Sequence, residues 1–271
     1  MSQVAVCIPT RHDRREAGTL GFPLVCLALQ TLQNFAIYIR DEGDHDAFAT
    51  PCFRLIVNLL ASRNIRVNYW RTRERRGVGF ARQSLFAAIR DEPWVLWLDD
   101  DMIIPPDALA KLVAFADAQP QSGFVQGSKI ELDPLRKYHN DINQLNRVPD
   151  DPRPLRLWFG DTACLLTRTE ALREIDWSVL TRYQLDGLTG EDVSMSLMIA
   201  QKYEGWGLPE VLGWHLSPAV ERWQWEPPSD ALQVELLKDK VDAELLQRAL
   251  PHLASSILRQ SGLDDPHESL P

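Results

Sequence analysis

Three consecutive aspartates, Asp99-Asp100-Asp101, follow directly after the apolar run Trp94-Val95-Leu96-Trp97-Leu98. Such a run predicts a strand that is buried on both faces. Ligands of open α/β sheets bind at the carboxyl ends of such strands. Three adjacent negative charges repel one another there, and a divalent cation that carries a phosphate-bearing ligand would balance them. The same residues could instead form a solvated acidic turn before a helix that opens at Pro105-Pro106-Asp107.

Three further polar clusters lie where strands or helices are expected to end or begin, at Pro9–Arg11, Asp41–Glu42 and Glu191–Asp192. Parallel strands end at one edge of a doubly wound sheet, so the first two clusters and the aspartate triplet should meet in space. Each cluster also has a simpler interpretation. The second is typical of a turn, and the third can complement the dipole at a helix start. A lone histidine such as His215 is commonly a buried side chain bonded to backbone.

A basic loop precedes the sequence Gly77-Val78-Gly79. Its arginines are Arg71, Arg73, Arg75 and Arg76, and Arg82 follows in the next helix. Glycines let a backbone approach a ligand closely, and a helix N-terminus favours anions. The loop therefore indicates an anionic phosphate ligand in a chain whose net charge is -9. The sequence contains no GxxxxGKS, and no GxGxxG follows the first strand, which argues against an ATPase P-loop and a dinucleotide fold.

Alternating strands and helices must position these residues. Strands are predicted over 4–8, 35–39, 66–70 and 94–98, and helices over 22–33, 51–63 and 80–91. This alternation predicts a parallel, doubly wound sheet with right-handed crossovers. In the second half we expect strands over 123–127 and 162–166, a lid-like loop over 131–156, a short helix from 169, a helix from 191 to near 205, and an amphipathic helix over 229–250.

Composition narrows the class of protein. The chain has 271 residues and 45% hydrophobic content, enough for a substantial core. Its negative net charge disfavours binding to nucleic acid or anionic lipid through bulk charge. Four scattered cysteines indicate a reducing compartment rather than a disulfide framework. No signal peptide or membrane-spanning run is expected. The protein is expected to be cytoplasmic. A peripheral location at the inner membrane face is the alternative.

The order of these features resembles that of family 2 glycosyltransferases. The resemblance rests on residues 4–10, 29–31, 41–44, 77–83 and 98–101, and it resumes at 190–192. It implies a GT-A fold, an α/β architecture whose doubly wound sheet is mostly parallel. A glycosyltransferase domain would then span 1–225, with a nucleotide-sugar-binding half at 1–120 and an acceptor-binding half at 121–225. Residues 226–271 would form a C-terminal helix and a frayed tail.

The resemblance also implies roles for individual residues. The nucleotide-sugar would be bound by Pro9, Thr10, Arg11, Asp41, Glu42, Arg82, Asp99 and Asp100. Asp101 would bind Mn²⁺ or Mg²⁺, with His215 as a further metal ligand, and Asp192 would be the general base. Glu42 stands where the family usually has an aspartate that reads the nucleobase.

The implied activity is metal-dependent, inverting transfer of a sugar from a nucleotide-sugar, with a UDP-sugar preferred, to a hydroxyl acceptor in glycan or polysaccharide biosynthesis. The acceptor could be a glycan, a lipid-linked saccharide or a protein, and the helix over 229–250 could pack on the core or form a homodimer contact. Two alternatives stay open. A sugar-1-phosphate nucleotidyltransferase would need a Gly-rich loop and a lysine that are absent at Thr10–Asp13. A noncatalytic nucleotide-sugar-binding protein would not need Asp101 and Asp192.

Overall fold

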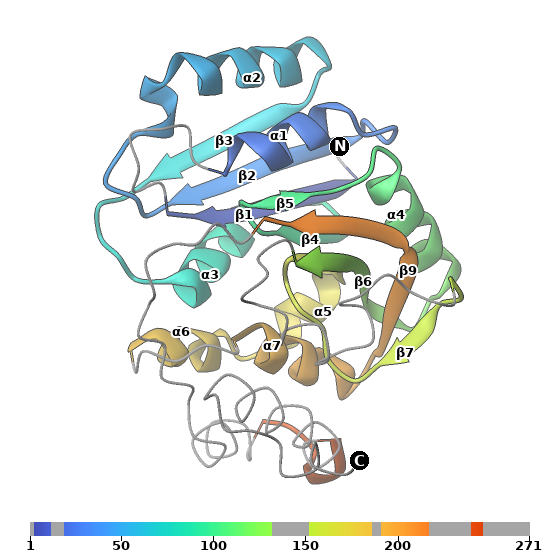
Figure 1. Ribbon diagram of the computed structural model, residues 1–271. Helices are drawn as coiled ribbons and strands as arrows, with labels where there is room; N and C mark the ends of the chain where they lie inside the picture. Colours follow the sequence, from blue (N-terminus) through green and yellow to red (C-terminus); the bar gives the residue numbers. More distant parts are fainter. Residues whose placement is uncertain (1–2, 12–18, 132–151, 186–190, 217–239, 246–271) are drawn as a thin grey trace, which may run out of the picture.

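The structure is a computed structural model that describes residues 3–11, 19–131, 152–185, 191–216 and 240–245. Its centre is a mixed sheet of nine strands in the order β3-β2-β1-β4-β8-β6-β9-β5, with β7 paired to β9 (Figure 1). The strands are β1 Val4–Thr10, β2 Phe35–Asp41, β3 Arg66–Arg71, β4 Trp94–Leu98, β5 Met102–Ile103, β6 Ser122–Glu131, β7 Leu155–Leu157, β8 Cys164–Arg168 and β9 Glu204–His215.

The first half of the sheet is parallel, as the sequence predicts. β1 pairs in parallel with β2 on one side and with β4 on the other, and β2 pairs in parallel with β3. The chain therefore winds in one direction from β1 to β3 and then crosses back to β4. All five side chains of β4 are buried, which accounts for its unbroken apolar sequence. The predicted α/β class and doubly wound arrangement are confirmed.

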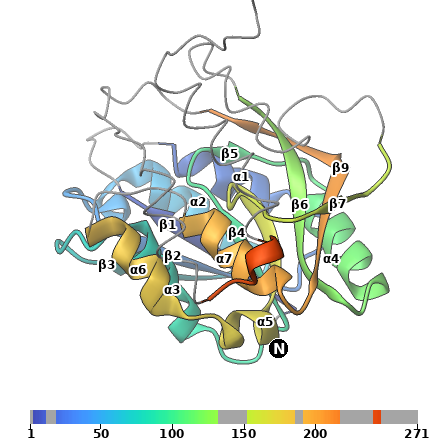
Figure 2. The ribbon, with the colours of Figure 1, turned by 90° about the horizontal axis from the view of Figure 1, so that it is seen from below.

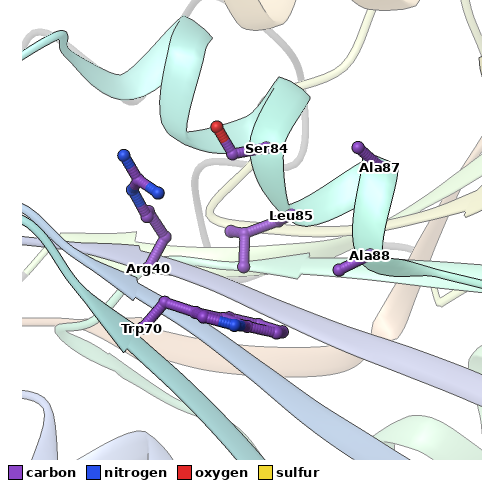
Figure 3. Close-up of a pocket in the computed structure, with 6 residues that line it drawn as sticks. All are labelled: Arg40, Trp70, Ser84, Leu85, Ala87 and Ala88. Atoms are coloured by element: carbon purple, nitrogen blue, oxygen red, sulfur yellow. The ribbon is translucent and has the colours of Figure 1, made fainter.

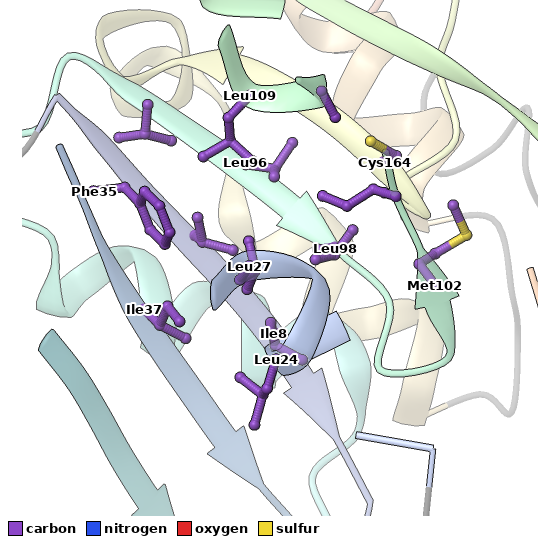
Figure 4. Close-up of a cluster of buried hydrophobic side chains, with 14 of the residues drawn as sticks. Ile8, Leu24, Leu27, Phe35, Ile37, Leu96, Leu98, Met102, Leu109 and Cys164 are labelled. Atoms are coloured by element: carbon purple, nitrogen blue, oxygen red, sulfur yellow. The ribbon is translucent and has the colours of Figure 1, made fainter. Parts of the chain in front are cut away.

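Helices cover both faces of the sheet. They are α1 Gly21–Ala28, α2 Pro51–Ser62, α3 Val78–Ala88, α4 Ala108–Ala118, α5 Thr169–Glu174, α6 Trp177–Leu185 and α7 Glu191–Ala200, with a short 3₁₀ helix η1 at Ala47–Ala49. Helices α1, α2 and α4 bury one apolar cluster against the sheet. Figure 4 shows the part of it that includes Leu24 and Leu27 of α1 and Leu109 of α4. Helices α3, α5, α6 and α7 lie on the opposite face (Figure 2). They bury a second apolar cluster there. Successive side chains of a strand point to opposite faces of the sheet, so each strand contributes to both apolar clusters.

The second half of the sheet departs from the parallel pattern. β8 runs antiparallel to both β4 and β6, while β6 runs parallel to β9. Helix α6 and strand β9 are not among the predicted elements, and the helix predicted from 191 to near 205 ends at Ala200. The pairing of β9 with β6 shifts register at two places, between Ser122 and Phe124 and between Gly127 and Ser128 of β6. Residues 132–151 of the expected lid lie outside the described residues, and the loop prediction is wrong at its end, because Leu155 and Arg156 belong to β7.

Helix α1 ends at Ala28, five residues earlier than predicted, and Gln30 just beyond it makes hydrogen bonds outside the helix. Its buried amide donates to the carbonyl of Pro105 at 2.8 Å, and its oxygen accepts from the backbone N–H of Leu109 at 3.0 Å. These bonds tie the end of α1 to the start of α4. The Gln30 side chain therefore links the segment after α1 to the N-terminal end of α4.

The predicted C-terminal helix over 229–250 is not continuous. Residues 229–239 and 246–250 lie outside the described part, but Lys240–Asp242 form a turn, and helical residues follow at 243–245. Asp242 caps them by accepting from the backbone N–H of Glu244 at 2.9 Å. Val241 and Leu245 are buried in the apolar cluster shared with α7. This segment packs on the core, the first of the two roles considered for it.

Gly77, at the N-cap of α3, and Gly79, inside α3, both meet local backbone and packing requirements. Gly77 has a φ of 85°, in the left-handed region that favours glycine. Gly79 lies against α6, where a Cβ atom would approach the carbonyl oxygen of Leu180 to 2.2 Å. The absence of a side chain at Gly79 therefore permits the close packing of α3 on α6.

Replacing Gly79 by alanine should lower the free energy of unfolding by about 1–3 kcal/mol, because the added methyl group forces α3 and α6 apart. Urea unfolding would measure the change. Gly21→Ala is the matched control, since its Cβ would lie 3.6 Å from Ile56 Cδ1, an ordinary contact. That variant should be as stable as the wild type or slightly more stable. Equal stability of both variants would contradict the close helix packing.

Candidate active site

The predicted clusters meet at the switch point of the sheet, where the chain turns from β1 outward in two directions. The Thr10 hydroxyl at the end of β1 donates to Asp100 Oδ2 just beyond β4. The backbone N–H of Glu42 donates to the carbonyl of Thr10 at 3.0 Å. Ends of β1, β2 and β4 are therefore neighbours, as the topology predicts. Arg11 follows directly after β1, and its side chain is exposed.

A short strand pairing brings His215 to the aspartate triplet. β5 pairs with the end of β9 so that Met102 lies opposite His215. His215 Nε2 is 2.9 Å from Asp101 Oδ1 and 3.7 Å from Asp99 Oδ2. One ligand atom from each of Asp99, Asp101 and His215 lies within 4.8 Å of the others. Two carboxylates and an imidazole at this spacing can hold a divalent cation.

Arg82 joins the two halves of the site. Arg82 is 3% exposed. It donates to Glu191 Oε1 on α7 and to the Thr162 hydroxyl before β8, and it lies 3.8 Å from Asp99 Oδ1. The family resemblance implies that Arg82 binds the nucleotide-sugar, and in the structure its charge is paired with Glu191 and Asp99. A buried arginine with these partners fixes the start of α7 relative to β4.

Burial and like charges raise the pKa of three carboxyl groups in the site. Burial, with Glu191 and Asp161 nearby, raises the pKa of Asp192 to about 7. Burial and Asp101 raise the pKa of Asp100 to about 7. Burial also raises the pKa of Asp99 to about 6, although His215 acts in the opposite direction. These carboxyl groups therefore titrate near neutral pH, where proton transfer and cation binding compete.

The sequence analysis missed an ion pair between Lys129 and Asp161. Lys129, on β6, is 5% exposed, and its ammonium group contacts Asp161 Oδ2. Asp161 Oδ1 also accepts from the backbone N–H of Ala163 at 2.7 Å. Burial alone would raise the pKa of Asp161, but Lys129 holds it below its usual value. No motif pointed to this pair, because Lys129 on β6 and Asp161, three residues before β8, lie 32 residues apart and meet only when β6 and β8 pair in the folded chain.

The acidic turn after β2 organises the basic loop. Asp41 is fully buried and accepts from the Tyr69 hydroxyl and the backbone N–H of Gly43, both at 2.7 Å. Glu42 Oε2 accepts from the backbone N–H groups of Arg76 and Gly77 at 2.9 and 2.7 Å. Asp41 therefore shapes a turn, as the simpler interpretation of the Asp41–Glu42 cluster predicts. The loop between β3 and α3 is held against the end of β2.

Sequence comparison identifies one family. The model of the family described as glycosyl transferase family 2 matches residues 5–176. No curated protein sequence gives a significant match. Across the part of the chain that the structure describes, no helix is long and apolar enough to span a bilayer.

Solved structures share the fold at low sequence identity. S. aureus TarS 1–349 in complex with UDP-GlcNAc has a TM-score of 0.64 at 15% identity, covering 96% of this chain and 73% of that one. The mannosyltransferase PcManGT from Pyrobaculum calidifontis, in complex with GDP-Man and Mn²⁺, has a TM-score of 0.64 at 16% identity, with coverages of 97% and 76%.

GalNAc-T7 with UDP, GalNAc and Mn²⁺ also matches, with a TM-score of 0.61 at 16% identity, over 87% of this chain and 48% of that one. These likenesses establish the fold, which is the GT-A fold of glycosyltransferases. The family match covers β1 to α5 and so includes the switch point and the aspartate triplet. With its fold and its sequence in agreement, the chain belongs to glycosyl transferase family 2 and is a glycosyltransferase.

Proposed function

We propose that the protein is a metal-dependent, inverting glycosyltransferase that transfers a sugar from a nucleotide-sugar to a hydroxyl group, with a UDP-sugar as the first donor to test. The observation that carries this proposal is the grouping of Asp99, Asp101 and His215 at the switch point. Relatives support the donor class, since TarS was solved with UDP-GlcNAc and PcManGT with GDP-Man and Mn²⁺. A glycan, a lipid-linked saccharide or a protein would supply the acceptor hydroxyl.

Asp101 and His215 would hold Mn²⁺ or Mg²⁺, and the position of Asp99 Oδ2 adds a third ligand atom. The bound cation would stabilise the negative charge that develops on the departing nucleoside diphosphate. Asp100 faces Thr10 instead, because its Oδ2 accepts from that hydroxyl. We therefore assign Asp100 and Thr10 to the ribose side of the donor pocket, beside Pro9 and Arg11.

Glu42 would contact the nucleobase through its second carboxylate oxygen. Oε2 is occupied by the backbone of the basic loop, whereas Oε1 is buried and has no hydrogen-bond partner among the described residues. Arg40 Nε lies 3.9 Å from Oε1, beyond hydrogen-bond distance. An imino N–H of a base is the kind of donor that would satisfy this atom. Asp41 would act by shaping the same turn.

Asp192 would accept the proton of the acceptor hydroxyl as its oxygen attacks the anomeric carbon opposite the diphosphate. Its pKa of about 7 suits a general base near neutral pH. A single displacement needs one base and no enzyme nucleophile, and it inverts the anomeric configuration. In this arrangement Arg82 is a positioning residue, because it holds Glu191, next to the base, and Asp99 at the donor side.

Asp192→Asn should abolish transfer while the donor still binds, because the amide cannot accept the proton. Loss of a positioned base typically costs about 10²–10⁴ in rate. Steady-state transfer assays and donor calorimetry on the same preparation would separate the two effects. Transfer by the variant at a rate near that of the wild type would remove Asp192 from the role of base.

The acidic limb of the pH–rate profile should follow Asp192. Its pKa is raised, so the carboxyl group becomes protonated and inactive as pH falls through about 7. Glu191→Gln removes the neighbouring negative charge and frees Arg82, and both changes lower the pKa of Asp192. The limb should therefore move by about one pH unit to lower pH. A limb that stays in place, or moves upward, would contradict this electrostatic assignment.

Thermal melts with UDP-, GDP-, CDP- and TDP-sugars, each with and without Mn²⁺, would test the donor and the metal together. A donor at 100 times its Kd stabilises the fold by about 2.7 kcal/mol, so Tm should rise by several degrees only when Mn²⁺ and the correct nucleotide are both present. Asp101→Ala should lose this joint effect. Asp107→Ala removes an exposed carboxylate on the sequence leading into α4 and should keep it. Equal Tm shifts in the two variants would refute the metal site.

A further inference from the structure

A hollow lies beneath α3, on the face of the sheet that carries the α5–α7 cluster. Its volume is about 250 Å³. Arg40 on β2, Trp70 on β3, and Ser84, Leu85, Ala87 and Ala88 on α3 line it (Figure 3). β3 is the outer strand of the sheet. The hollow is therefore reached from the edge of the sheet.

The walls of this hollow form a flat slot. The indole of Trp70 lies along the sheet beneath Leu85 and Ala88, while Arg40 rises beside Ser84 (Figure 3). Trp70 is 40% exposed, although it stacks on Tyr38 with ring centroids 6.1 Å apart. Alanines at two of the helix positions leave space above the ring that larger side chains would fill. A large aromatic face is thus available to a ligand.

Arg40 supplies hydrogen-bond donors at one end of the slot. Its guanidinium carbon lies 5.6 Å from the centre of the Phe80 ring, and its Nε lies 3.9 Å from Glu42 Oε1. These neighbours hold the side chain in place, and Glu42 offsets part of its charge. A guanidinium has five N–H donors, and the Ser84 hydroxyl stands on the facing helix. The slot therefore combines an apolar floor with donors at one end.

We propose that this slot is a secondary saccharide site that binds one sugar ring, stacked on Trp70 and hydrogen-bonded by Arg40 and Ser84. The choice of a saccharide rests on the proposed function. A pyranose has an apolar face for the indole and hydroxyl groups around its rim. The slot volume suits one ring, since it lies just below the range of pockets that hold drug-sized ligands.

The slot and the proposed catalytic groups lie on different sides of α3, although they are close in sequence. Arg82 reaches Glu191 and Asp99, whereas Ser84, two residues later, lies on another face of the helix and lines the slot. Ala87 and Ala88 lie a further turn away, and Arg40 links the slot to Glu42 of the proposed donor pocket. A sugar stacked on Trp70 would therefore not present its hydroxyl to Asp192. It would instead be a distant unit of a longer acceptor or product, held while another unit occupies the active site.

Ligand-observed NMR titration of the full chain, with UDP and Mn²⁺ present to occupy the donor pocket, would test the site. Glucose, N-acetylglucosamine and glucuronate serve as neutral, amide-bearing and acidic probes. We expect at least one to bind with a millimolar Kd. Trp70→Ala should raise that Kd about tenfold by removing the stacking face. Ala87→Leu should block binding by filling the slot.

Ala61→Leu is the matched control, because Ala61 is an exposed helical position on α2. It should leave sugar binding unchanged. Ala87→Leu should also keep the wild-type affinity for the donor. Failure of the proposed donor site and failure of the proposed saccharide site would therefore give different results. No binding of any probe at tens of millimolar, or binding that survives Ala87→Leu, would overturn the proposal.

Discussion

Negative charge at the carboxyl edge of the sheet is the constraint that organises this site. Six carboxyl groups gather there, from Asp99, Asp100, Asp101, Asp161, Glu191 and Asp192. Arg82 and Lys129 form the buried ion pairs that partly balance them, with Glu191 and Asp161. Burial, together with neighbouring carboxylates, still raises the pKa of Asp99, Asp100 and Asp192. A cation at the remaining carboxylates would lower this cost and would also attract a diphosphate.

The fold places these groups by joining its two halves at one point. β1 and β4 carry the donor-side residues to the switch point, whereas β8, α7 and β9 bring Thr162, Glu191 and His215 from the second half. Arg82 spans the junction, and the pairing of β5 with β9 closes it. A displacement of α7 would therefore change the position of the Arg82 guanidinium and its distance to Asp99. The contacts of Arg82 thus connect the helix that carries the proposed base with one of the proposed metal ligands.

Local sequence signals were sufficient for the first half of the chain. Unbroken apolar strands and amphipathic helices have strong periodicity, so β1 to β4 and the meeting of Thr10 with Asp100 could be predicted. The second half depends on distant pairing. β5 has two residues, and nothing local indicates that Met102 should lie opposite His215, 113 positions later. Lys129 and Asp161 meet for the same reason. The helix expected over 229–250 failed at Lys240–Asp242, where a capping aspartate overrides the apolar period.

The central claim is that the aspartate edge and His215 grip a divalent cation that in turn holds a nucleotide diphosphate. Anomalous diffraction at the manganese edge, from crystals grown with Mn²⁺ and a bound nucleotide-sugar, tests it directly. The account predicts one strong peak within bonding distance of Asp101 Oδ1 and His215 Nε2, touching the diphosphate oxygens. An ordered nucleotide-sugar with no manganese between it and these side chains would contradict the account.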